Sequence, residues 1–104
     1  MKIIRILRIP QVAQYESDVL QILNQYKFEA TIMCYRTVIY TYVSGDYINS
    51  STFQEFINIL ETSPNTNDRT IIVEYEDESG DIFEDQFIFD YYDRSTNRLQ
   101  FIML

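Results

Sequence analysis

The feature that most constrains this chain's fold is the run of thirteen residues 31–43, which no glycine, proline or other turn-forming residue interrupts. β-Branched and aromatic side chains dominate the run, and this composition favours an extended strand. A single strand of that length spans roughly 40 Å at about 3.3 Å per residue, which is more than a small sheet needs. The strand is therefore expected either to bend at a bulge or to overhang its sheet. An overhang would leave Tyr40, Thr41 and Tyr42 as an exposed edge, where a second copy or a partner strand can pair.

Periodic apolar positions predict two helices. Residues 11–28 are predicted to form the first, because six side chains recur at three- and four-residue steps: Val12, Tyr15, Val19, Leu20, Leu23 and Tyr26. The second is predicted over residues 52–62, with Thr52 and Glu55 as a capping box at its start. Its buried stripe is expected to consist of Phe53, Phe56, Ile57 and Leu60.

Alternating patterns predict the remaining strands. Residues 3–9 form a first strand that Pro10 ends, and the last third of the chain is predicted to be a three-stranded meander with turns at 77–80 and 93–97. Because alternate residues share a face, the inward-facing side chains of the meander are expected to be Ile71, Val73 and Tyr75, then Phe83, Phe87, Phe89 and Tyr91, then Leu99, Phe101 and Met103.

These elements follow one another in the order β-α-β-α-β-β-β. We predict a single α+β domain over residues 1–104, because a chain of this length is too short for two domains. The economical arrangement is a largely antiparallel sheet of about five strands with two helices packed on one face.

The sequence lacks the side chains on which most enzymes rely. It has no histidine, two lysines and two glycines, so an imidazole base and a glycine-rich phosphate loop are excluded and a lysine nucleophile has few candidates. Its one cysteine, Cys34, stands in the middle of the predicted strand and is expected to be buried as a small hydrophobic side chain. We therefore expect no enzyme, no metal site and no cofactor. A hydrolase that holds a metal through carboxylates such as Glu84 and Asp85 is the weaker alternative.

Acidic residues are concentrated in the second half of the chain. Residues 1–50 carry five basic and four acidic groups, whereas residues 51–104 carry three basic and twelve acidic groups, so all of the net charge of −8 arises there. Such a density of like charge costs stability through self-repulsion, which favours a role in binding; solubility alone is the alternative explanation. We predict that the partner-binding surface consists of the acids and neighbouring tyrosines of the predicted hairpin: Glu74, Glu76, Asp77, Glu78, Asp81, Glu84, Asp85, Asp90, Tyr91, Tyr92 and Asp93.

In size and charge the chain resembles the small acidic inhibitor proteins of viruses and mobile elements, which block host nucleases or other defence proteins, some of them by mimicking DNA. This resemblance covers no motif and assigns no residue. It implies a basic, nucleic-acid-handling protein as the partner. A homodimeric assembly module is the alternative function.

The same charge bears on what does not bind. Neither a nucleic acid nor a membrane surface is expected to be a direct partner, because both repel a polyanion. Arginines interrupt the apolar residues of the segment 1–10, so no signal peptide is expected there. We expect a reducing compartment, the cytoplasm, which is the host's if the protein is viral.

Overall fold

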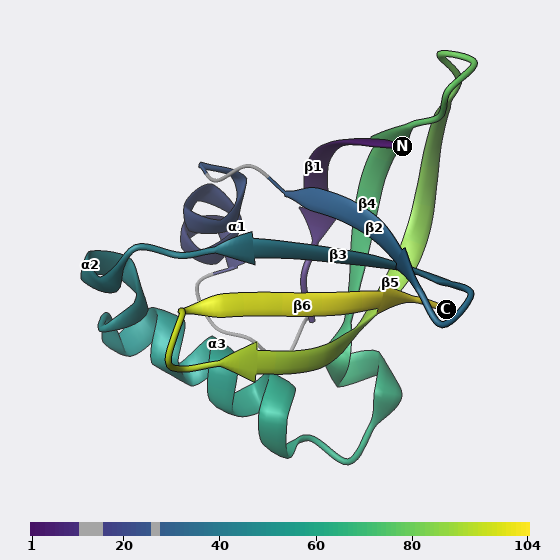
Figure 1. Ribbon diagram of the computed structural model, residues 1–104. Coiled ribbons are helices and arrows are strands. Elements are labelled where there is room, and N and C mark those ends of the chain that lie inside the picture. The colour runs from purple at the N-terminus through teal and green to yellow at the C-terminus, as the bar shows by residue number, and fades with distance from the viewer. Residues whose placement is uncertain (11–15, 26–27) are drawn as a thin grey trace.

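The computed structural model describes residues 1–10, 16–25 and 28–104. These residues form a small α+β fold (Figure 1). From the N-terminus its elements are β1 (Lys2–Arg8), α1 (Glu16–Asn24), β2 (Glu29–Met33), β3 (Arg36–Tyr42), α2 (Gly45–Ile48), α3 (Ser51–Thr62), the 3-10 turn η1 (Thr66–Arg69), β4 (Thr70–Glu76), β5 (Ile82–Asp93) and β6 (Arg98–Met103).

All six strands belong to one curled antiparallel sheet in the order β1-β4-β5-β6-β3-β2. The expected class and the largely antiparallel sheet are confirmed, with one strand more than predicted and a short additional helix, α2. The helices α1 and α3 pack against the inner face of the sheet at the end where the β5–β6 turn lies. The β2–β3 and β4–β5 turns lie at the other end, which we call the open end (Figure 1).

The predicted thirteen-residue strand is wrong, because Cys34 and Tyr35 break it into the β2–β3 hairpin. Their φ angles are +51° and +66°, and Met33 pairs with Arg36 across a two-residue turn. Two positive φ values in succession define the hairpin turn that matches the right-handed twist of its strands. Asn-Gly is the usual sequence for such a turn. The residues Cys34 and Tyr35 therefore do not predict a turn at this position. Cys34 is exposed in this turn instead of buried in a strand.

The expected edge is wrong at Tyr40, because β3 lies between β2 and β6 there, whereas the register partners of Thr41 and Tyr42 are Leu99 and Arg98 of β6. Tyr40 lies opposite Glu29 on β2 and opposite Gln100 on β6. The free edges of the described sheet are β1 and β2. A second copy would therefore meet β1 or β2 before it could reach the backbone of β3.

The second predicted helix is confirmed as α3, with its cap placed earlier than expected. The Ser50 hydroxyl accepts a hydrogen bond from the Phe53 N–H at 3.2 Å, so Ser50 and not Thr52 caps the helix. The four apolar residues expected on its buried stripe are all buried.

Of the first predicted helix, the structure describes α1 over Glu16–Asn24. Val19 and Leu23 are buried as expected. The expectations for Val12, Tyr15 and Tyr26 lie outside the described residues. At the end of α1, the Asn24 side chain accepts from the Ile6 N–H at 2.8 Å and donates to the Ile6 carbonyl at 3.0 Å. This pair of bonds fastens the helix to the free edge of β1.

The inward pattern of the meander holds until a bulge at Asp90. Phe89 lies opposite Phe101, but Tyr91 lies opposite Gln100, so one extra residue occupies β5 between them. A bulge shifts the alternation that follows it. The expected inward position of Tyr91 is therefore wrong: Tyr91 is 48% exposed and Tyr92 is buried.

Candidate functional site

The eleven residues predicted to bind a partner do not form one surface. β5 is twelve residues long, so its two ends lie roughly 40 Å apart at about 3.3 Å per residue. Asp90, Tyr91, Tyr92 and Asp93 lie at the helix-covered end, whereas the seven residues from Glu74 to Asp85 lie toward the open end (Figure 1).

The group at the covered end mainly stabilises the fold. Asp90 accepts a hydrogen bond from the Gln100 amide at 2.8 Å. Asp93 accepts from both the hydroxyl and the backbone N–H of Ser95, at 2.6 and 2.9 Å, and these bonds hold the pKa of Asp93 below its usual value. Tyr92 is buried and donates to the Asn97 side chain at 3.2 Å. Asp90 and Tyr91 are the exposed members of this group, and Asp90 already accepts the Gln100 bond.

On the outer face of the β4–β5 hairpin, β1 supplies cations to the acids. Arg5 Nε lies 3.3 Å from the Glu74 carboxylate, and Lys2 is opposite Glu76 in the register. The sequence places no base between Glu74 and Asp93, so these neighbours were missed. They come from a strand about seventy residues earlier in the chain, and only the sheet order brings them here.

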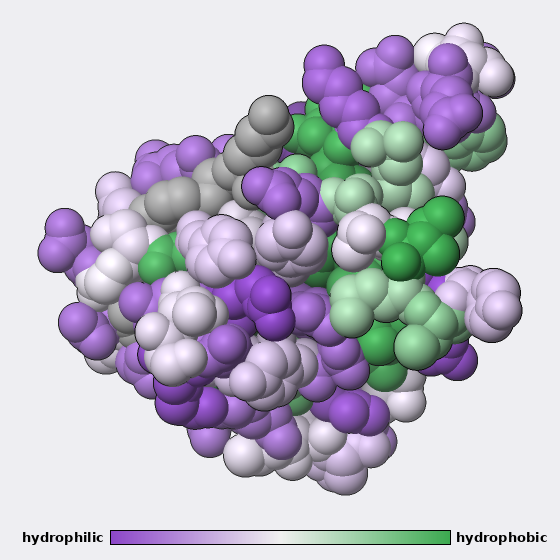
Figure 2. Space-filling model, in the orientation of Figure 1, coloured by the Kyte–Doolittle hydropathy of each residue, from purple (hydrophilic) through white to green (hydrophobic). Residues whose placement is uncertain are grey.

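The turn of the hairpin and the first residues of β5 carry acids of two kinds. Asp77 builds the turn, because its carboxylate accepts from the N–H groups of Ser79 and Asp81 at 2.9 and 3.0 Å. Glu78, Asp81 and Glu84 are exposed, and no cationic side chain of the described residues forms an ion pair with them. We call these three residues the acidic tip. Figure 2 shows hydrophilic side chains gathered on this projecting hairpin.

Apolar side chains accompany the acidic tip. Ile82 and Phe83 are 54% and 43% exposed, and the Phe83 ring stacks on Tyr75 at 5.7 Å between centroids. The Tyr75 hydroxyl donates to Asp85 at 2.5 Å, and this bond raises the pKa of Tyr75 to about 12. Phe83, Tyr75 and Asp85 all lie on the inner face, whereas Glu84 lies on the outer face.

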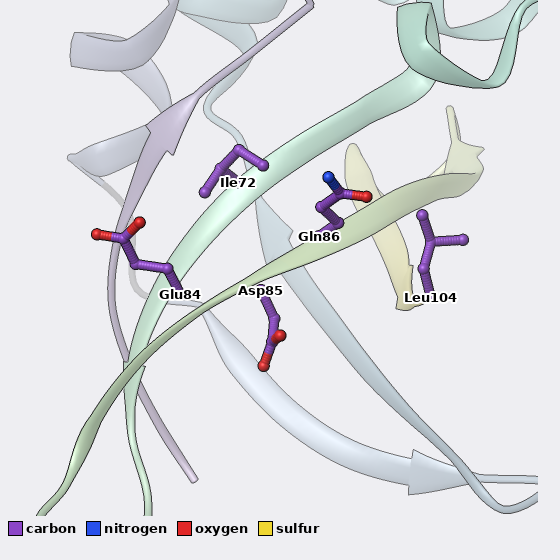
Figure 3. A pocket seen from close by; sticks show the side chains of 5 residues that line it. All are labelled: Ile72, Glu84, Asp85, Gln86 and Leu104. Atoms are coloured by element: carbon purple, nitrogen blue, oxygen red, sulfur yellow. The ribbon is translucent and has the colours of Figure 1, made fainter.

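A shallow pocket of about 420 Å³ lies beside this part of β5, lined by Ile72, Glu84, Asp85, Gln86 and Leu104 (Figure 3). Glu84 and Asp85 leave neighbouring positions of the strand in different directions, so their carboxylates do not converge on one point. In the described parts of the chain, no three acidic or cysteine side chains are grouped closely enough to hold a metal ion.

The chain matches no family model, and the searches find no similar curated protein or solved structure. Among the described helices, none combines the length and the apolar character that crossing a membrane requires.

Proposed function

We propose that this protein is a non-catalytic binding protein that inhibits a basic, nucleic-acid-handling partner through the acidic tip of its β4–β5 hairpin. The observation that carries the proposal is the acidic tip, where three exposed carboxylates form no ion pair with a cation of the described residues. Glu78 and Asp81 lie past the residues that pair with β1, and Glu84 lies across β4 from Arg5, whose ion pair is with Glu74. Ile82 and Phe83 are exposed beside them. Interfaces of this kind combine charge that steers the encounter with aromatic contact area that holds the complex.

The electrostatics of the tip fit a protein that binds phosphates. Arginine and lysine side chains that neutralise a nucleic-acid backbone form equally good charge-assisted hydrogen bonds with carboxylates. A carboxylate-bearing hairpin therefore competes for the groove that the nucleic acid would occupy. The net charge of −8 adds long-range attraction to a basic partner.

The proposal is tested with three proteins of matched design. The tip variant carries Glu78→Gln, Asp81→Asn and Glu84→Gln, and the control variant carries Asp18→Asn, Asp46→Asn and Glu55→Gln, so both lose three negative charges. The partner captured by the wild-type protein from native host cells is bound to each in turn. Association rates are measured at about 0.1 and about 1 M salt, where the Debye length is about 10 and about 3 Å.

We expect the tip variant to associate at least about tenfold more slowly than wild type at low salt, with most of its salt dependence gone. The control variant should associate nearly as fast as wild type. Equal rates for the tip and control variants would show that only net charge matters and would remove the tip from the interface. Inhibition of the partner's nucleic-acid binding, measured in the same samples, separates an inhibitor from a passive binder.

A homodimeric assembly module is the second candidate function, and the free edge of β2 is the observation that favours it. Thr31, Ile32 and Met33 carry no charge and are exposed along this edge, and uncharged edges pair readily with other strands. Light scattering at micromolar concentration distinguishes the two functions: a mass of 12.5 kDa contradicts the dimer, and twice that mass supports it.

A further inference from the structure

The inner face of the sheet is covered by helices at one end only. At the covered end, Phe87, Leu99 and Phe101 are fully buried beneath α1 and α3. The same face continues to the open end, where no described helix lies over it (Figure 1). A sheet face with apolar side chains normally packs against a further layer. Here Met103 is partly buried against the core, whereas Ile32 and Phe83 remain exposed.

The uncovered part of the inner face combines apolar and acidic groups. Its positions follow from the strand register, and we call them the open trough: Ile32, Thr37, Tyr75, Phe83, Asp85 and Met103. Ile32 is 75% exposed, which is the greatest exposure of any aliphatic side chain in the described chain. Asp85 is the carboxylate of this face, and its bond from Tyr75 leaves its remaining lone pairs open to a donor. Figure 2 shows hydrophobic side chains gathered below the hydrophilic hairpin tip.

The trough is hollowed on two sides. A depression of about 290 Å³ lies between Met1, Ile32, Thr37 and Glu78, and a second of about 370 Å³ lies between Tyr35, Arg36, Thr37 and the C-terminal residues 103–104. The first joins the trough to the acidic tip, because Glu78 is one of its walls. An occupant that fills it meets apolar side chains and a carboxylate together.

We infer that the open trough binds a cationic amphipathic helix of the partner, with the apolar stripe of that helix against Ile32, Phe83 and Met103 and a lysine or arginine directed to Asp85. This inference deepens the proposed function and rests on it. A helix is the natural occupant because the same face already packs α1 and α3 at its other end, and helix on sheet is the packing that such a face supports.

Charge decides between a foreign helix and a second copy of this chain. Asp85 and Glu78 favour a cation. Among the described side chains that line the two depressions, Arg36 is the basic one that opposes them, and it lines the far depression. A second copy would bring another net charge of −8 to a surface that is already acidic, which is unfavourable. The basic partner of the proposed function supplies the complementary charge.

Two synthetic peptides test the inference without a known partner. The first is an amphipathic helix of leucine and lysine, and the second has the same length and charge with serine in place of every leucine. We expect the wild-type protein to bind the leucine peptide at least about tenfold more tightly than the serine peptide. The burial of a single leucine side chain is enough to give about a tenfold difference in affinity. Backbone and methyl NMR signals of Ile32 and Met103 should shift with the leucine peptide.

Paired variants locate the site on the trough. Ile32→Ser should abolish the preference for the leucine peptide, whereas Ile82→Ser, at an exposed isoleucine on the outer face, should keep it. Asp85→Asn keeps an acceptor for the Tyr75 hydroxyl and should lower the affinity of the protein for both peptides several-fold. Asp90→Asn on the same strand should not. Circular dichroism confirms that each variant is folded before it is compared.

The outcomes separate this inference from the proposed function. If the wild-type protein binds both peptides equally, or if Ile32→Ser and Ile82→Ser have the same effect, the trough is not the site and the inference fails. The function test with the tip variant is unaffected by that result. The converse result is a wild-type protein that prefers the leucine peptide and a tip variant that binds the captured partner as well as wild type does. That result refutes only the role of the acidic tip and leaves the trough inference standing.

Discussion

Tyr75 donates a hydrogen bond to Asp85 across the β4–β5 pair, along the diagonal of the register. Tyr75 lies opposite Phe83, and Asp85 lies opposite the buried Val73, so both polar groups share the inner face with apolar neighbours. A carboxylate there needs a donor, because an unpartnered polar group on an apolar face costs free energy. The bond meets that need and holds the Tyr75 hydroxyl in its protonated form.

The first prediction concerns the titration of Tyr75. Its pKa is raised to about 12 by the bond to Asp85, above the usual value of about 10, so its phenolate should form late when absorbance near the tyrosinate band is followed against pH. Tyr75→Phe should remove this late component. Tyr91→Phe, at an exposed tyrosine, should leave this late component in place. The component will overlap with Tyr40 and Tyr92, whose pKa values are raised by the Glu29 bond and by burial, so tyrosine ring NMR resolves the assignment.

The first prediction extends to stability, through the same bond. Because the folded pKa of Tyr75 lies above the unfolded value, the stabilisation is complete below pH about 10 and is lost as the pH rises toward 12. Tyr75→Phe should lower the free energy of unfolding by about 1 kcal/mol at neutral pH. In urea titrations at rising pH this difference should shrink. A difference that stays constant through the alkaline range would contradict the role of the hydroxyl proton.

A second prediction concerns the turn at Cys34 and Tyr35. Both residues have positive φ angles, a region that costs non-glycine residues about 1 kcal/mol or more each. Replacing them with Asn and Gly, the usual residues of this turn, should raise the free energy of unfolding by about 1 kcal/mol. Tyr35 is fully exposed, so no packing is lost. Tyr35→Phe is the control and should leave the urea midpoint unchanged; a gain from that variant would assign the effect to side-chain polarity instead.

The third prediction concerns the ion pair between Glu61 on α3 and Arg94 in the β5–β6 turn. The two guanidinium nitrogens of Arg94 donate to the two carboxylate oxygens, one of them at 2.8 Å, and this lowers the pKa of Glu61. A lowered pKa gives stability that is present above the unfolded value and lost as the pH falls. Glu61→Gln should therefore lower the thermal midpoint slightly at pH 7, since both side chains are partly exposed. The variant and the wild-type protein should converge in acid, and Glu55→Gln serves as the control.

The fourth prediction follows from the internal position of β3. A proline at Thr41 removes a backbone donor from a strand that lies between β2 and β6, so Thr41→Pro should lower the free energy of unfolding by about 1 to 3 kcal/mol, the cost of a buried acceptor left without its donor. Thr41→Val keeps the backbone donor and the shape of the side chain, and should cost less. Urea unfolding followed by circular dichroism measures both. A Thr41→Pro protein of normal stability but smaller mass would restore the edge hypothesis.

Local pattern alone determined most of the elements. The stripe from Phe53 to Leu60 repeats at helical steps, and the alternation from Ile71 to Tyr75 repeats at strand steps. Each pattern requires one buried face wherever the element packs, so its type and inward residues follow from the sequence. Composition likewise placed the greatest density of acids on the β4–β5 hairpin.

The turn within residues 31–43 and the bulge in β5 depend on tertiary structure, and the local sequence pattern does not predict them. The turn at Cys34 and Tyr35 forms because the free energy gained by pairing β2 with β3 exceeds the cost of two positive φ angles. Neither residue is of a type that predicts such a turn. The bulge at Asp90 reverses Tyr91 and Tyr92 for a similar reason, because β6 sets the register. Such choices depend on partner strands far along the chain.

The candidate surface shows the same division most clearly. The sequence supplied Glu74, Glu78 and Asp85 as one acidic run, but sheet order gave Glu74 the guanidinium of Arg5, and strand alternation placed Asp85 on the inner face. Glu78 alone of the three remains an exposed carboxylate at the tip. The sequence alone determines how many charged side chains the chain carries. Whether a carboxylate is paired with a cation, and which face of the sheet it lies on, depends on which strands are neighbours, because charges interact strongly only when the fold brings them close together.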